Sequence, residues 1–177
     1  MTIIENMEKN INLKELFTQE AGRVEEDCTF SAKGHMNAAA TWRRVNYYLG
    51  IPATCLTALA GASAANMVVD NEYAPMIAFL STIITALLTF IKPEEKADLH
   101  SKSGNSLNSL KNNIRIFKNI EVLQSEDTES LANKLNLLSD ERNKLNKESL
   151  SIPYFAYRKA KKGIEIGESS YKIDSTK

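Results

Sequence analysis

The stretch LGIPATCLTALAGASAANMVVDNEYAPMIAFLSTIITALLTFIKPEE, residues 49–95, decides the fold of this chain. It contains two uncharged runs, 49–69 and 73–91, which are separated by the polar residues 70–72. A helix rises ~1.5 Å per residue, so the runs predict helices of about 31 and 28 Å, close to the ~30 Å hydrocarbon core of a bilayer. Each run is therefore long enough to cross a membrane.

The second run gives the stronger membrane signal. It is dense in Ile, Leu and Phe, each of which favours insertion by roughly 0.3 to 0.6 kcal/mol. The first run is rich in Ala, Gly, Ser and Thr, and we expect it to insert together with the second as a hairpin. The alternative is a buried helical pair in a soluble bundle. Because a soluble core helix rarely needs an uncharged surface around its whole circumference, the membrane hairpin is favoured.

Charges beside the two runs predict the orientation of the hairpin. Arg43 and Arg44 precede the first run, Lys92 and Lys96 follow the second, and the connecting residues 70–72 contain no Lys or Arg. The positive-inside rule then places both termini in the cytoplasm. Aromatic residues mark the expected interfaces with the headgroups: Trp42, Tyr47, Tyr48 and Tyr73.

Both spans carry small or hydroxylated residues at fourfold spacing. In the first span these are the predicted packing and oligomerisation residues Ala53, Thr57, Gly61 and Ala65. Such a face lets helices approach closely in lipid, where packing must replace the hydrophobic drive. In the second span they are Ser81, Thr85 and Thr89. This stripe has two interpretations: its hydroxyls bond to backbone carbonyls, or they line a water-filled path through an assembly of hairpins.

The rest of the chain is also predicted to be helical, which makes the fold all-α. Residues 13–48 have helical spacing with an irregularity near 29–31, and Pro52 either starts a new helix or kinks a continuous one. Pro93 suits the first position of a cytoplasmic helix. The cytoplasmic helices are expected at about 93–120, 129–149 and 154–166. The domain division is an N-terminal helical extension 1–28, a main domain 29–170 and a polar tail 171–177.

The stripe of the 129–149 helix is made of Leu131, Leu135, Leu138 and Leu145. It suits packing against a neighbouring helix, either in the core of the same chain or in a dimeric coiled coil.

Composition excludes several classes of function. The chain has 22 basic and 22 acidic residues, so no overall field would gather nucleic acid, and no nucleic-acid partner is expected. The sequence has no glycine loop that would hold phosphate, no Cys and His set with metal spacing and no nucleophile beside a base. We therefore predict no enzyme, no catalytic residue, no metal and no cofactor.

Two further groups of residues could have a role. His35 and His100 flank the hairpin on its cytoplasmic side, as packing histidines or as a pH-sensing, gating pair. Four basic residues near the C-terminus form a solvated helix face, or they contact anionic lipid or a nucleotide phosphate: Arg158, Lys159, Lys161 and Lys162.

Three blocks of the chain resemble the SLATT family of bacterial two-helix membrane proteins. They are FSAKGHMNAAATWRRVNYYLGIPATCLTALAGASA at 30–64, FIKPEEKADLHSKSGNSLNSLKNNIR at 90–115 and LSDERNKLNKESLSIPYFAYRKAKKGIEIGE at 138–168. The resemblance implies an effector of nucleotide-signalling and anti-phage systems in the bacterial inner membrane. Such a protein would oligomerise on infection and permeabilise the membrane, which kills or arrests the cell.

Two other functions remain open. One is a non-conducting membrane scaffold whose cytoplasmic helices recruit a nucleotide-generating or nucleotide-sensing protein. The other is a soluble helical interaction module. The expected partners are the lipid bilayer, further copies of the chain, and a sensor or nucleotide-synthesising protein or a nucleotide second messenger.

Overall fold

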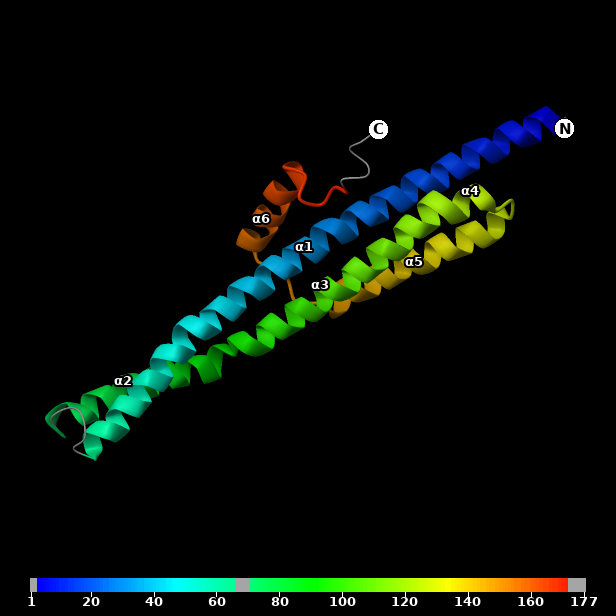
Figure 1. The fold of residues 1–177 in the computed structure, drawn as a ribbon. Coiled ribbons are helices and arrows are strands. Elements are labelled where there is room, and N and C mark those ends of the chain that lie inside the picture. The colour runs from blue at the N-terminus through cyan, green and yellow to red at the C-terminus, as the bar shows by residue number, and fades with distance from the viewer. Residues whose placement is uncertain (1–2, 66–70, 172–177) are drawn as a thin grey trace. The chain divides into compact units, whose positions relative to one another are not determined.

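The computed structural model describes residues 3–65 and 71–171, which are almost entirely helical and contain no strand. The helices are α1 (Ile3–Ala64), α2 (Ala74–Ile91), α3 (Pro93–Ile116), α4 (Val122–Gln124), α5 (Thr128–Glu148) and α6 (Tyr154–Glu165) (Figure 1). The predicted all-α class is confirmed. The predicted turn residue Asp70, the end of the first predicted span at 66–69 and residues 172–177 of the predicted tail lie outside the described residues.

The chain divides into two compact units. The larger unit contains the residues up to Ala38 and those from His100 onward, and the smaller unit contains Ala39–Leu99. The larger unit therefore combines the first part of α1 with most of α3 and all of α5 and α6. The smaller unit contains the last part of α1, α2 and the first turns of α3.

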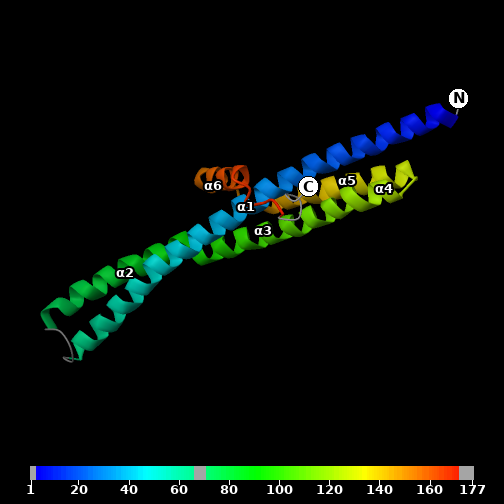
Figure 2. The ribbon, with the colours of Figure 1, turned by 45° about the horizontal axis from the view of Figure 1, so that its top comes forward.

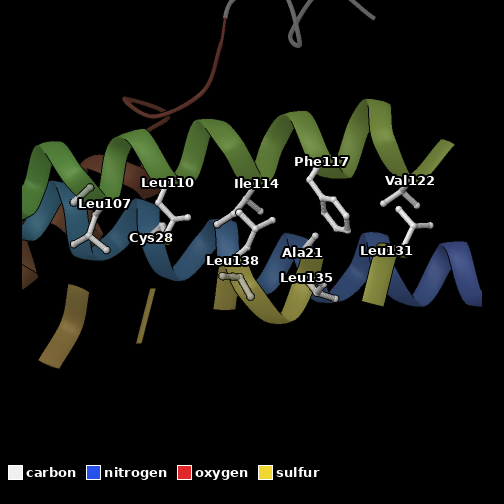
Figure 3. Packing of buried hydrophobic residues seen from close by; sticks show 12 residues of the cluster. Ala21, Cys28, Leu107, Leu110, Ile114, Phe117, Val122, Leu131, Leu135 and Leu138 are labelled. Carbon is white, nitrogen blue, oxygen red and sulfur yellow. The ribbon is translucent and has the colours of Figure 1, made fainter. Parts of the chain in front are cut away.

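The core of the larger unit lies between α1, α3 and α5, which run alongside one another in both views (Figures 1 and 2). Large side chains come from α3 and from the segment that follows it, and Figure 3 shows them directed toward α1 and α5. The fully buried ones are Leu107, Leu110, Ile114, Phe117 and Val122. On α1 the buried positions are small: Ala21, Val24, Cys28 and Ala32.

Small residues on α1 let α3 approach closely. A Cβ atom added at Gly104 of α3 would lie 3.2 Å from the carbonyl oxygen of Ala32 on α1. The large α3 side chains pack beside this contact, which agrees with the dense packing of protein interiors. The buried thiol of Cys28 is part of the same core, and burial raises its pKa to about 11. Cys28 and Cys55 are both free cysteines.

The leucine stripe of α5 packs inside the chain. Leu131, Leu135 and Leu138 are buried in the core with α1 and α3, and Leu145 is partly buried against them. The first turn of α5 is capped by Asp127, whose carboxylate accepts hydrogen bonds from the backbone N–H groups of Glu129 and Ser130.

Helix α6 packs against α1 through small residues. Ala156, Ala160 and Gly163 are its buried positions. The ring of Tyr157 lies 6.5 Å from that of Phe30, measured between centroids. Both views show α6 beside α1 (Figures 1 and 2).

The irregularity expected near 29–31 is wrong, because α1 continues as one helix of 62 residues. The hydroxyl of Thr29 donates to the carbonyl oxygen of Glu25, one turn earlier, at 2.8 Å, so its hydrogen bond is made within the helix. Its neighbours Cys28 and Ala32 are held in the core. Tertiary packing thus overrides the weak local helix propensity of this segment. No division of the helix occurs at the predicted boundary after residue 28, and α1 also continues through Pro52.

The helix expected at about 93–120 begins at Pro93, as predicted. Lys92 separates it from α2 in the left-handed conformation, with φ of 50°. The N–H of Lys92 still caps α2 by donating to the carbonyl oxygen of Leu88 at 2.9 Å. Because a residue before proline disfavours the α-helical region, the helix is interrupted at this point.

A π-helical turn, Phe117–Glu121, joins α3 to α4. A π-helix advances by i→i+5 hydrogen bonds, so residues five apart return to nearly the same face. Phe117 and Val122 are five apart, and both are fully buried. The chain becomes non-helical at Ser125–Asp127, between the helices predicted at about 93–120 and 129–149.

We expect Leu110→Ala to lower the stability of the larger unit by about 3 kcal/mol, because the substitution removes a fully buried side chain and leaves a cavity. The matched control is Leu137→Ala on α5, where the side chain is 70% exposed. That variant should stay within about 0.5 kcal/mol of the parent chain. Unfolding in detergent micelles, followed by circular dichroism, measures both changes. Equal losses would contradict the assignment of the core.

Candidate functional site

The first candidate site is the surface of α2. An 18-residue window in the helical stretch Ala74–Gln124 has a mean hydropathy of 2.1, and this is the one helix among the described residues that is long and apolar enough to cross a membrane. Only Ala74 and Ser81 of α2 are buried. Phe79 is 65% exposed and Phe90 is 88% exposed. The helix therefore presents nearly all of its apolar side chains outward.

One polar contact joins α2 to the last part of α1. The hydroxyl of Ser81 donates to the carbonyl oxygen of Ala53 at 3.0 Å and lies 2.5 Å from the hydroxyl oxygen of Thr57. The hydroxyl of Thr57 also donates to Ala53 O, at 2.9 Å. The two helices lie side by side in both views (Figures 1 and 2). Ala53 and Thr57, predicted to associate helices, thus contact the neighbouring helix of the same chain.

The other two members of that small-residue face are not used in this contact. Gly61 has open space around it, since a Cβ atom built there would meet nothing within 4 Å. Ala65 follows the end of α1 and is exposed. Close approach by another helix therefore remains sterically possible at Gly61.

The hydroxyl stripe of α2 lines an open groove of ≈ 640 Å³. The groove is lined by Thr57, Ser81, Thr82, Thr85, Ala86, Thr89 and Phe90. Within the stripe, Thr85 donates to the carbonyl oxygen of Ser81 and Thr89 donates to that of Thr85, both at 2.9 Å. Each threonine thus bonds to its own helix, although its oxygen can still accept a hydrogen bond.

Charged and aromatic residues pair beside the apolar surface of the smaller unit. The ammonium group of Lys96 lies 4.6 Å from the ring centroid of Trp42, and Arg43 pairs with Asp98 at 3.8 Å. Tyr47 and Tyr48 have exposed rings. This arrangement suits residues at a membrane surface, where an amphipathic ring meets charged groups.

The second candidate site is a buried histidine pair in the larger unit. The Nδ1 atoms of His35 on α1 and His100 on α3 are 2.9 Å apart, and each residue is 2% exposed. A hydrogen bond at this distance requires one Nδ1–H to donate to the other, unprotonated Nδ1. Burial, together with the neighbouring His100, lowers the pKa of His35 to about 4. Burial also lowers the pKa of His100. The two rings are therefore neutral at pH 7.

The predicted basic cluster lies on the exposed side of α6. Arg158, Lys159, Lys161 and Lys162 are exposed. Arg158 lies 5.8 Å from the ring centroid of Tyr154, and Lys161 approaches Glu165 at 3.9 Å. The exposed charges are available to an anionic surface or ligand.

A third site was not predicted from the sequence. It is a cleft of ≈ 390 Å³ in the larger unit, and its lining comes from α1, α3 and the segment after α6. Lys33, Lys111, Glu168 and Tyr171 are among its lining residues. They come from three distant parts of the chain, so no local motif unites them. The closest sequence signal is the basic pair Lys111 and Arg115, one helical turn apart.

Within the described residues, no group of three His, Cys, Asp or Glu side chains is placed to hold a metal ion. No protein-family model, curated protein or solved structure matches this chain.

The histidine pair generates a pH prediction. Folding lowers the pKa of His35 from about 6.5 to about 4. Between pH 6.5 and pH 4, the imidazole of His35 is therefore protonated in the unfolded chain but neutral in the folded chain. Titration of His35 therefore does not lower the free energy of unfolding above pH 6.5. On acidification toward pH 4 it lowers that free energy by up to about 3 kcal/mol. We expect the melting temperature to fall between pH 7.5 and pH 5.

The control is the double variant His35→Gln/His100→Gln, which keeps hydrogen-bonding groups at both positions but cannot titrate. Its melting temperature should fall less over the same pH range. An equal fall in the two proteins would show that other groups cause the acid sensitivity.

Proposed function

We propose that this protein is a membrane effector that spans the bacterial inner membrane as a helical hairpin, oligomerises and permeabilises the membrane when triggered. The observation that carries this proposal is the outward apolar surface of α2. A soluble core helix of the same composition would bury most of its side chains, whereas α2 buries Ala74 and Ser81. Transfer of apolar surface out of water is favourable by ~25 cal/mol per Å². A bilayer provides apolar surroundings for the exposed side chains of α2.

The last part of α1 is proposed as the second span. It is uncharged from Leu49 to Ala64, and it shares the Ser81 contact with α2. Its Thr54 and Thr57 hydroxyls donate to carbonyl oxygens one turn earlier, so these groups are satisfied without water. The positive flanks then place both termini in the cytoplasm.

Permeation requires several copies, because two helices cannot enclose a path. The open position at Gly61 gives a surface where another copy can approach closely. The groove along Thr82, Thr85 and Thr89 supplies polar groups on an otherwise apolar helix. The resemblance to SLATT proteins supports a role in antiviral defence by abortive infection, in which a signalling partner protein or a nucleotide second messenger supplies the trigger.

The second candidate function is a non-conducting membrane scaffold. One observation favours it: Thr85 and Thr89 already donate their hydroxyl hydrogens to backbone carbonyls. Such threonines are stable in a dry environment and do not require a water-filled path. In this case the larger unit recruits a nucleotide-generating or nucleotide-sensing protein to the membrane.

The proposed topology predicts which sites a membrane-impermeant thiol reagent can reach. In a Cys28→Ala/Cys55→Ala background, Glu72→Cys should be labelled from outside the inner membrane, because Glu72 is exposed in the 3-10 turn that precedes α2. The exposed Asn136→Cys on α5 should be labelled only after the membrane is opened. Labelling of Asn136→Cys in cells with an intact inner membrane would contradict cytoplasmic termini.

The permeation step is tested by Thr85→Val, which keeps the shape of the side chain but removes the polar oxygen from the groove. If the groove conducts, an apolar constriction excludes water, and membrane depolarisation after overexpression should slow severalfold. The matched control is Thr54→Val on α1, which removes a similar bond to a carbonyl oxygen but lies outside the groove lining. It should depolarise cells at the parental rate. At equal membrane abundance, parental depolarisation by Thr85→Val would favour the scaffold.

A further inference from the structure

We propose that the cleft between α1, α3 and the segment after α6 binds a small phosphate-bearing anion. Its cationic contacts are Lys33 and Lys111, which line the cleft, and Arg115, which lies beside the cleft against the ring of the lining residue Tyr171. The cleft lies within the larger unit and has a volume of ≈ 390 Å³, which is the usual size of a small-molecule site. The proposal does not depend on permeabilisation of a membrane.

Unbalanced positive charge on α3 is the first reason. Lys111 and Arg115 lie one turn apart and are both half-buried. Among the residues that the structure describes, neither has a carboxylate at ion-pair distance. Instead, both face the ring of Tyr171, with the Lys111 ammonium 5.6 Å and the Arg115 guanidinium 4.7 Å from its centroid. A ring only partly offsets the charge of two cations, so an anion is favoured beside them.

The state of Lys33 is the second reason. Its ammonium group lies in the cleft, 2.7 Å from a carboxylate oxygen of Glu168 and 3.5 Å from the hydroxyl oxygen of Ser169. The hydrogen bond and the charge of Lys33 lower the pKa of Glu168. Glu168 is the one carboxylate among the described residues that line the cleft. The carboxylate of Glu168 therefore occupies the position beside Lys33 that an oxygen of a bound anion would take. In this sense Glu168 is an internal stand-in for the anion.

The backbone after α6 holds this stand-in in place. Gly167 has φ of +84°, a conformation that favours glycine, and the N–H of Glu168 donates to the carbonyl oxygen of Gly163 at 2.9 Å. A Cβ atom at Gly163 would lie 2.4 Å from Glu168 Oε2 and 2.9 Å from Lys33 Nζ. The absence of a side chain at Gly163 thus leaves room for the ion pair.

A phosphate group matches this arrangement better than a carboxylate. It carries up to about two negative charges and three acceptor oxygens, so it can satisfy several cations at once. The planar guanidinium of Arg115 can bind two phosphate oxygens together. A soluble phosphate ester and a phosphomonoester lipid headgroup share this chemistry, and the test must separate them.

The test uses the full chain in nonionic detergent, with the melting temperature followed by circular dichroism. Sodium pyrophosphate should raise the melting temperature of the parent chain in a saturable way, compared with sodium chloride at equal ionic strength. Lys111→Gln/Arg115→Gln should weaken the apparent affinity by about tenfold or more. The matched control, Lys102→Gln/Lys144→Gln, removes two exposed lysines outside the cleft lining and should keep the parental affinity.

Glu168→Gln provides a test in the opposite direction, since removing the stand-in charge should tighten pyrophosphate binding severalfold. Dihexanoyl phosphatidic acid, below its micellar concentration, is the lipid-headgroup probe. Tighter binding of this probe than of pyrophosphate supports the site with a lipid ligand, and the reverse supports it with a soluble one. No saturable stabilisation by either probe, or equal affinity in Lys111→Gln/Arg115→Gln and its control, would overturn the proposal.

Discussion

The close packing of α1 against α3 is the contact on which the larger unit depends. Small residues on α1 leave room for large ones from α3, and the absence of a side chain at Gly104 lets the two backbones approach near Ala32. The histidine pair and the cleft are both built between these helices. A bulkier contact would separate His35 from His100, so the same packing that forms the core also sets the hydrogen bond between the two rings.

In the smaller unit, most apolar side chains of α2 are exposed and not packed into a core. Its α2 helix has almost no buried side chain, and its contact with α1 is polar and local, through Ser81 and Thr57. In water such a helix would leave a large apolar surface unpaired. In lipid the same composition is favourable, and small or hydroxylated residues become the usual means of helix contact. The two units, which share α1, therefore differ sharply in how much of their apolar surface is buried.

The helices were largely predictable from the sequence, because the spacing of hydrophobic residues and the positions of prolines are local indicators of where a helix lies. The leucine stripe at Leu131, Leu135 and Leu138 and the helix start at Pro93 are examples. The continuity of α1 at Thr29 was not predictable, because core packing of its neighbours decides it. The sequence predicts that His35 and His100 both flank the hairpin, but their contact depends on tertiary packing. The cleft was missed because Lys33, Lys111 and Glu168 come together only in the folded chain.

The π-helical turn at Phe117–Glu121 also shows how the chain accommodates a change in length. It keeps Phe117 and Val122 on one face although five residues separate them, a spacing that would turn an α-helix by roughly 140°. An in-frame loss of one codon here would place the two buried side chains four positions apart, a spacing that an ordinary α-helix keeps on one face. At the genetic level, the π-helical turn therefore corresponds to an insertion of one residue that keeps both side chains in the core.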